Sequence, residues 1–88
     1  MNKESIPIIA PLFRFQWEEA QKCYVVLYPE GMVKLSPSAG EIMKLVNAED
    51  NISKIIKTLS DQFDGADVGE DVVAFFIEAE SNGWIQLK

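Results

Sequence analysis

Two hydrophobic periods divide the chain near Ser36. Before that residue apolar and polar side chains alternate, which is typical of strands with one buried face. The run Phe13-Arg14-Phe15-Gln16-Trp17 predicts a first strand. The next run, Lys22 to Tyr28, is apolar on both faces, so we expect it to be the central strand. One face carries Cys23, Val25 and Leu27, and the other carries Tyr24, Val26 and Tyr28.

The turn after the central run predicts a β-hairpin over residues 22 to 35. Pro29 presets φ for the turn, and Gly31 can supply the positive φ of a three-residue loop. The second arm, Met32 to Leu35, ends at Ser36-Pro37 because proline lacks a backbone donor. If no other segment pairs with this arm, its backbone groups are available to another peptide.

From Ser36 onward the period changes to about 3.6 residues, which predicts helices. The first helix has two candidate starts, either Ser36 with Pro37 at the first helical position or a capping box of Ser38 and Glu41. The sequence leaves both starts open. Its apolar stripe consists of Ala39, Ile42, Met43 and Val46.

A second helix is predicted from about Ile52 to Phe63, with Asn51 as its N-cap and Asp64-Gly65 as its end. Its apolar face consists of Ile52, Ile55, Ile56, Leu59 and Phe63.

The third helix is predicted from about Val68 to Asn82, with Asp67 and Glu70 in capping-box spacing and Gly83 as the stop. Its apolar side chains cover about half of its circumference. A helix that packs on a core with one face needs an apolar stripe of only roughly 100°. A core sector holds Val68, Val72, Phe75, Phe76 and Ala79, and a second sector holds Val73 and Ile77 and would continue to Trp84. Residues 84–87 alternate again, which predicts a short last strand or an extended tail.

The N-terminal run Ile6 to Leu12 is apolar but contains two prolines. We expect an extended, polyproline-like arm that does not pair regularly. Such an arm covers the core of its own domain or is exchanged with another copy, and burial of its apolar side chains favours the first alternative. The predicted organisation is therefore an arm over residues 1–12 and a single domain over residues 13–88.

Composition narrows the possible functions. With 88 residues, of which 48% are hydrophobic, the chain suits one compact domain. Because it has no His and a single Cys, it lacks the usual transition-metal ligand sets, the Ser–His and Cys–His pairs of catalytic sites, and an internal disulfide. We therefore expect neither an enzyme nor a cofactor. No signal peptide or membrane-spanning run is evident, so we expect a soluble cytoplasmic protein that does not bind membranes.

Charge is distributed unevenly along the chain. Residues 1–36 are neutral overall, whereas residues 37–88 contain four Lys and ten Asp or Glu and so carry the whole net charge of −6. Three antiparallel strands, three helices and a short extended end predict an α+β domain that resembles a winged helix-turn-helix, a fold that often binds DNA. The acidic excess opposes phosphate binding, so a nucleic-acid-binding or other interaction module is only the alternative.

A further hypothesis is a peptide-binding module. A free edge at Met32 to Leu35 can accept an added strand, and the spare sector of the third helix can line an adjacent groove. The alternative is that Val73 and Ile77 pack against the N-terminal arm or the first helix, and the sequence pattern favours neither. The expected peptide-binding residues are Met32, Val33, Lys34, Leu35, Val73, Phe76, Ile77 and Glu80.

Three short runs carry a resemblance to a known family. They are Gln16-Trp17-Glu18-Glu19-Ala20-Gln21, the run Leu27-Tyr28-Pro29-Glu30-Gly31-Met32-Val33-Lys34-Leu35, and Ala39 with Ile42 and Leu45. They closely resemble the PqqD family of pyrroloquinoline quinone (PQQ) biosynthesis. The similarity spans about Phe13 to Ile85 and leaves out Ile6 to Leu12.

The resemblance implies a peptide chaperone with the winged-helix-like fold of RiPP recognition elements, which bind ribosomally made precursor peptides. Such proteins bind the precursor peptide PqqA and deliver it to the radical SAM enzyme PqqE, which joins a Glu and a Tyr side chain of that peptide. In these elements the leader peptide adds to the third strand, in a groove shared with the third helix. Those elements correspond here to Met32–Leu35 and Val68–Asn82. The chaperone itself would carry no cofactor, and both a monomer and a dimer remain open.

Overall fold

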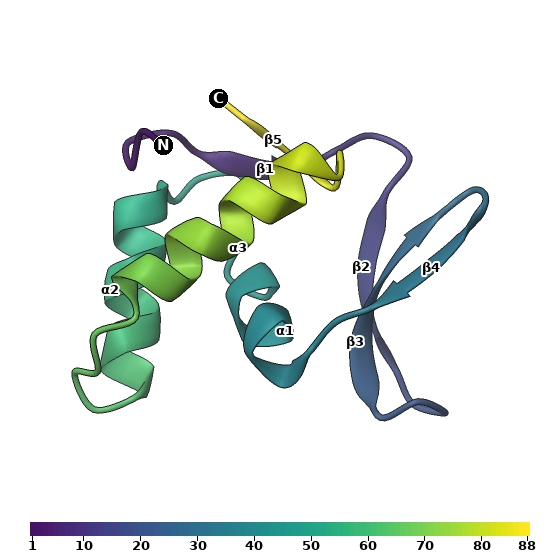
Figure 1. Ribbon diagram of the computed structural model, residues 1–88, viewed down its shortest axis with the longest axis horizontal. Coiled ribbons are helices and arrows are strands. Elements are labelled where there is room, and N and C mark those ends of the chain that lie inside the picture. The colour runs from purple at the N-terminus through teal and green to yellow at the C-terminus, as the bar shows by residue number, and fades with distance from the viewer.

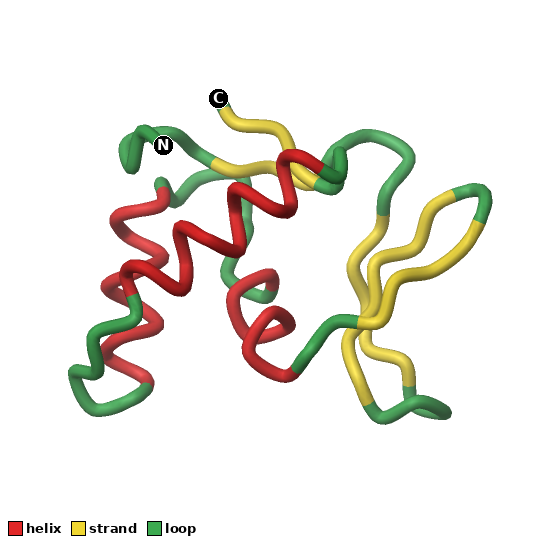
Figure 2. The backbone as a smooth tube through the Cα atoms, viewed as in Figure 1, coloured by secondary structure: helices red, strands yellow, loops and turns green.

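A computed structural model describes all residues, 1–88. A three-stranded antiparallel sheet lies at one end of the molecule and three helices lie at the other, as Figure 1 shows. A separate two-stranded ribbon, formed by the two ends of the chain, runs along the helical end (Figure 2). The predicted α+β class is confirmed, as is the order of three strands, three helices and a short extended end.

The three-stranded sheet consists of β2 (Arg14–Glu18), β3 (Cys23–Tyr28) and β4 (Gly31–Lys34). β3 lies between the other two strands, as its two apolar faces predicted. In the β3–β4 hairpin Val26 lies opposite Val33, and Val25 lies opposite Lys34. β4 pairs with β3 alone, so its other edge is free.

The hairpin turn is tighter than predicted. Tyr28 pairs with Gly31, which leaves a loop of only Pro29 and Glu30. Gly31 does not have a positive φ, so the predicted three-residue loop with a left-handed Gly31 is wrong. The glycine still relieves crowding, because a Cβ there would lie 3.3 Å from the hydroxyl oxygen of Tyr28.

The helix α1 (Pro37–Met43) begins at Ser36. The Ser36 Oγ accepts the backbone N–H of Ala39 at 3.2 Å, so the structure selects the Ser36-Pro37 start. The capping box of Ser38 and Glu41 does not form, since Glu41 instead accepts a hydrogen bond from Lys44. Ile42 and Met43 are buried as predicted, whereas Val46 lies beyond the end of the helix.

The contact between α1 and β3 is unusually close at Gly40. A Cβ added to Gly40 would lie 2.8 Å from Cδ2 of Tyr24, a distance that real Cβ atoms do not reach. The missing side chain therefore allows α1 to lie directly against the inner face of the sheet.

The helix α2 (Ile52–Gln62) is capped by Asn51, whose Oδ1 accepts the backbone N–H of Lys54 at 2.8 Å, as predicted. Phe63 lies one residue past the helix and is 52% exposed, so its predicted place on the buried face is wrong. The backbone leaves the helical path there and then turns through positive φ at Asp64 and Gly65. The buried residues of α2 are Ile52, Ile55 and Leu59.

The helix α3 (Gly69–Ser81) crosses the other two helices (Figure 1). The predicted capping box of Asp67 and Glu70 is wrong, because Val68 is the N-cap and makes no side-chain hydrogen bond. Asp67 instead accepts the N–H of Gly69 at 3.4 Å, whereas a capping box would require the N–H of Glu70. Four residues of the predicted core sector, Val72, Phe75, Phe76 and Ala79, are buried on α3, whereas the fifth, Val68, precedes the helix and is half-buried.

The C-terminal end of α3 is a Schellman motif. Gly83 has φ +79° and donates to the Glu80 carbonyl at 3.0 Å, and Trp84 donates to the Ala79 carbonyl at 2.9 Å. This turn directs Trp84 into the core, where it is 8% exposed and lies 6.4 Å from the ring of Phe75. Trp84 therefore belongs to the core and does not continue the second sector of the helix.

The N-terminal segment pairs regularly, which corrects the predicted unpaired arm. The strand β1 (Pro7–Ile9) is antiparallel to β5 (Ile85–Leu87). Ile6 and Lys88 exchange backbone hydrogen bonds of 3.0 and 2.9 Å. Because bonded and non-bonded pairs alternate, Pro7 occupies a non-bonded position opposite Leu87, where its missing N–H costs no ladder bond.

The residues before β1 also bind the chain's own helical end. The backbone N–H groups of Ile52 and Ser53, at the start of α2, donate to the carbonyls of Ser5 and Lys3 at 3.0 Å each. The first turn of a helix lacks internal partners for its N–H groups, so these carbonyls satisfy two of them. The N-terminal segment therefore lies on its own chain.

None of the helices combines the length and the apolar character that crossing a bilayer requires.

Gly40→Ala is expected to destabilise the domain by about 1 to 3 kcal/mol, because the added methyl group must displace the Tyr24 ring or shift α1. Thermal unfolding monitored by circular dichroism measures this loss. Gly69→Ala is the matched control, since a Cβ at Gly69 would have no neighbour closer than 3.8 Å. The control should unfold at the same or a higher temperature because alanine favours helices. Equal melting of wild type and Gly40→Ala would contradict the close contact.

Candidate functional site

The free edge of β4 offers unpaired backbone groups in a defined order. Leu35 donates its N–H to the Tyr24 carbonyl at 2.9 Å, which makes this pair a hydrogen-bonded one. Bonded and non-bonded pairs alternate along an antiparallel ladder, so Val33 bonds to β3 and Lys34 does not. The N–H and C=O groups of Met32 and Lys34 therefore point outward. This edge can accept another extended chain.

The side chains of β4 alternate between the two faces of the sheet. Met32 and Lys34 are exposed on the outer face, away from the helices. Val33 is half-buried against the core, and Leu35 is buried at 7% exposure. Of these four expected site residues, Met32 and Lys34 provide the open edge, and Val33 provides an inward side chain beside it.

Two hollows lie between α3 and the β4–α1 segment. The first, between the hairpin and the C-terminal end of α3, is lined by Phe13, Tyr28, Glu30, Val33, Asn82 and Trp84. The second, between the start of α1 and the middle of α3, is lined by Ser36, Ser38, Ala39, Ile42, Asp71, Ala74, Phe75 and Glu78. We call the two hollows together the β4–α3 groove.

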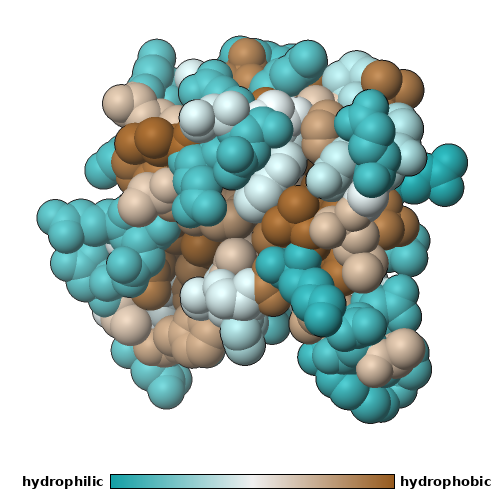
Figure 3. Space-filling view, turned by 45° about the vertical axis from the view of Figure 1, so that its right-hand side comes forward, coloured by the Kyte–Doolittle hydropathy of each residue, from teal (hydrophilic) through white to brown (hydrophobic).

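One stripe of α3 lines the whole β4–α3 groove. Asp71, Phe75, Glu78 and Asn82 follow one another at steps of three or four residues, so they share a face of the helix. Phe75 is the only large apolar residue among them. Figure 3 shows apolar residues gathered across the middle of one face of the molecule, with hydrophilic residues around them.

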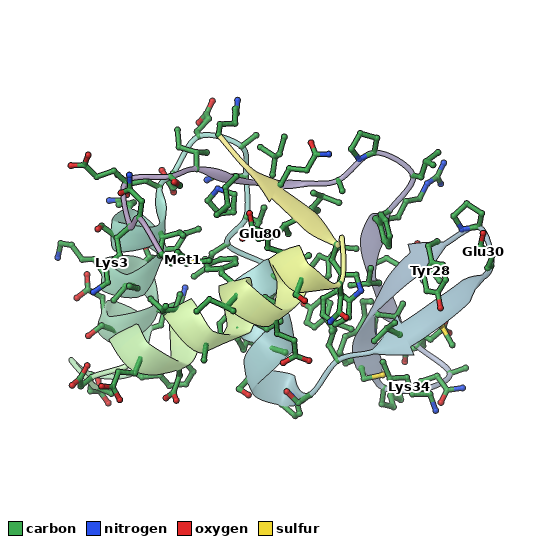
Figure 4. All side chains as sticks on the ribbon, turned by 45° about the horizontal axis from the view of Figure 1, so that its top comes forward. Met1, Lys3, Tyr28, Glu30, Lys34 and Glu80 are labelled. Carbon is green, nitrogen blue, oxygen red and sulfur yellow. The ribbon has the colours of Figure 1, made fainter.

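The structure does not bring the expected α3 residues to this groove. Val73 and Ile77 line a different hollow, which also includes Lys3 of the N-terminal segment. At 100° per residue Val73 lies about 200° around the helix from Phe75. Ile77 is 52% exposed on that other side, and Phe76 is completely buried. Figure 4 shows that Glu80, also exposed, lies well away from Lys34 on the hairpin.

The α3 residues of the groove were missed because most of them are polar. Hydrophobic periodicity identifies apolar faces, whereas Asp71, Glu78 and Asn82 are indistinguishable from an ordinary solvated face. The available signal was Phe75, which lies at one border of the core sector. Its position alone does not show which border faces β4.

The groove carries carboxylates without cationic partners. The ion pairs of the chain join Lys22 to Glu19, Lys44 to Glu41 and Lys57 to Asp61, and all lie on the surface. Neither Asp71 nor Glu78, which line the groove, takes part in one. The hydrogen bond with Glu41 and the charge of Glu41 raise the pKa of Lys44, and the two side chains form the 3.3 Å ion pair. The groove is thus acidic.

No group of three or more His, Cys, Asp or Glu side chains is placed to hold a metal ion. The single thiol, Cys23, is half-buried on β3. Open backbone groups beside a groove lined by apolar side chains and unpaired carboxylates are features suited to holding an extended peptide.

Comparison with known proteins gives a consistent picture. The family described as "Coenzyme PQQ synthesis protein D (PqqD)" matches residues 23–85. A "PqqA binding protein" of Pseudomonas aeruginosa is 45% identical over 86 residues, which cover 97% of this chain and 94% of the relative. A protein of the same name from Azotobacter vinelandii is 46% identical over 83 residues, with coverage of 93% and 90%.

A solved structure shares the fold. It is the solution structure of the PqqD truncation of Methylobacterium extorquens PqqCD, described as a functional and stand-alone RiPP recognition element. The two folds superpose with a TM-score of 0.81 over 98% of this chain and 94% of the other, at 19% sequence identity. The family match, covering most of the chain, and relatives at 45% identity over nearly its full length show that this chain belongs to the PqqD family.

Proposed function

We propose that this chain binds the precursor peptide PqqA as an added strand on β4 and presents it to the radical SAM enzyme PqqE in PQQ biosynthesis. One observation carries the proposal. The outward N–H and C=O groups of Met32 and Lys34 are unpaired, and they lie beside a groove that another element, α3, completes. The names of the relatives, "PqqA binding protein", supply the identity of the peptide.

In this arrangement the peptide's main chain bonds to the edge of β4. Every second side chain of an added strand points toward the same face, so alternate side chains enter the β4–α3 groove. Val33 and Phe75 provide apolar contacts there, and Asp71 and Glu78 provide acidic ones. The proposed site thus keeps the β4 residues expected from the sequence and uses a different face of α3.

The chain acts by binding and not by catalysis. A strand added to β4 uses one edge of the peptide and leaves its other edge open, which gives an enzyme access to the substrate while the chaperone holds it. We propose that the domain is winged-helix-like but that its ligand is a peptide and not a nucleic acid. The carboxylates on the groove face of α3 would repel nucleic-acid phosphates.

Proline substitutions in β4 test strand addition. Lys34→Pro removes an outward N–H, so we expect a folded domain whose affinity for PqqA falls at least tenfold. Val33→Pro removes an inward donor to β3, so we expect a lower melting temperature. Lys34→Ala keeps the N–H and should bind PqqA almost as wild type does. Isothermal titration calorimetry and thermal melts measure these effects, and a folded Lys34→Pro with native affinity would exclude strand addition at this edge.

The face of α3 that meets the peptide is tested by a 15N-HSQC titration with PqqA. We expect shifts centred on Met32 to Leu35 and on the stripe of Asp71, Phe75 and Glu78. Ile77→Asp should fold, because Ile77 is 52% exposed, and should bind PqqA within about twofold of wild type. Shifts centred on Val73 and Ile77, together with a tenfold or larger loss in Ile77→Asp, would instead assign the site to the face predicted from the sequence.

A further inference from the structure

A third hollow continues the β4–α3 groove beyond α1. It is mainly apolar and lies between α1, the C-terminal end of α2 and the loop that leads to α3. Its lining consists of Ser38, Glu41, Ile42, Leu59, Phe63, Ala66, Val68 and Asp71. Ser38, Ile42 and Asp71 also line the second hollow of the groove, so the two hollows adjoin. We call this third hollow the Phe63 seat.

Phe63 is held in an exposed position by its loop. The Ser60 hydroxyl donates to the Ala66 carbonyl at 2.7 Å, and the Gly65 N–H donates to the Ser60 carbonyl at 2.8 Å. The Ala66 N–H donates to the Phe63 carbonyl at 3.2 Å, which closes the loop on itself. The ring of Phe63 is 52% exposed and lines the hollow together with the core residue Leu59, so the hollow presents apolar surface to solvent.

The rim of the Phe63 seat is acidic. Glu41 and Asp71 lie on it, and Glu41 is paired with Lys44 at 3.3 Å whereas Asp71 has no cationic partner. A ligand that matches both features has an apolar side chain for the hollow and a basic side chain close to it. A second copy of this chain also carries a net charge of −6, so the two copies repel each other overall. The charge therefore favours a peptide over self-association.

We propose that the Phe63 seat binds an apolar side chain of PqqA that lies next to a basic residue, in the same peptide whose strand adds to β4. This inference rests on the proposed function. The position of the seat supports it, since the seat shares Ser38, Ile42 and Asp71 with the second hollow of the groove, at the start of α1 that directly follows β4. The seat thus extends recognition beyond the added strand and selects for peptide sequence.

The first test compares the affinity of PqqA for four proteins by calorimetry. Phe63→Ser should bind about tenfold more weakly than wild type, because truncating an apolar anchor residue commonly costs this much. Its melting temperature should be unchanged, since Phe63 is half exposed and lies beyond the end of α2. Leu12→Ser is the control, because Leu12 is 79% exposed and lines neither the groove nor the seat. Lys34→Pro reports on the added strand alone.

A second variant and a peptide scan make the test independent of the folding of Phe63→Ser. Ala66→Trp places a large side chain in the seat from an exposed loop position, and it should weaken the binding of PqqA to a similar extent. Single alanine replacements of the apolar residues of PqqA should identify one whose loss weakens binding to wild type but not to Phe63→Ser. That coupling would show that the two side chains touch.

The outcomes separate the two proposals. Lys34→Pro could lose its affinity for PqqA while Phe63→Ser and Ala66→Trp keep that of the wild type. In that case the seat is not part of the site, and the proposed function stands. If wild type does not bind PqqA, both proposals fall. If Phe63→Ser keeps its affinity for PqqA but alters the sedimentation behaviour of the free protein, the seat serves a second copy and the inference is overturned.

Discussion

The close packing of α1 on β3 is the contact on which the rest of the site depends. Gly40 meets the ring of Tyr24 at a distance that leaves no room for a Cβ, so α1 lies directly on the inner face of the sheet. Only Leu35 and Ser36 join β4 to α1. The position of α1 on β3 therefore also fixes where the chain goes after β4. The α3 helix packs against both other helices, and the space left between α3 and the β4–α1 segment is the groove.

An open strand edge is ordinarily a hazard, because it can pair with any extended chain. Here β4 has only four residues and carries Lys34 on its outer face, and both properties limit uncontrolled pairing. In the proposed site the neighbouring face of α3 adds selectivity, because its carboxylates would repel acidic chains and Phe75 would offer a small apolar contact. A binding site of this kind needs few apolar residues, since main-chain hydrogen bonds supply much of the attachment and side chains supply the choice of partner.

The two ends of the chain stabilise the helical end away from this site. β1 and β5 pair with each other, and the carbonyls of Lys3 and Ser5 accept N–H groups at the start of α2. Lys3 also lines the hollow that contains Val73 and Ile77, so the second apolar sector of α3 faces the N-terminal segment and not the hairpin. The fold shared with the Methylobacterium extorquens structure at 19% identity is consistent with an architecture that depends on hydrophobic pattern more than on particular residues.

The sequence by itself determined the local elements: a central strand with two apolar faces, the Asn51 cap, the Gly83 stop and the core side of α3. Its local period reports which faces of an element are apolar, but it carries no information about which distant segment covers each face. The tertiary structure alone therefore decided that Pro7 pairs with Leu87, since that register joins opposite ends of the chain. It also decided that the polar stripe through Phe75, and not the apolar pair of Val73 and Ile77, faces the β4–α1 segment. The physical reason is that burial gives an apolar pattern to the faces that pack together, whereas a face that lines an open groove stays in contact with water and retains a polar pattern.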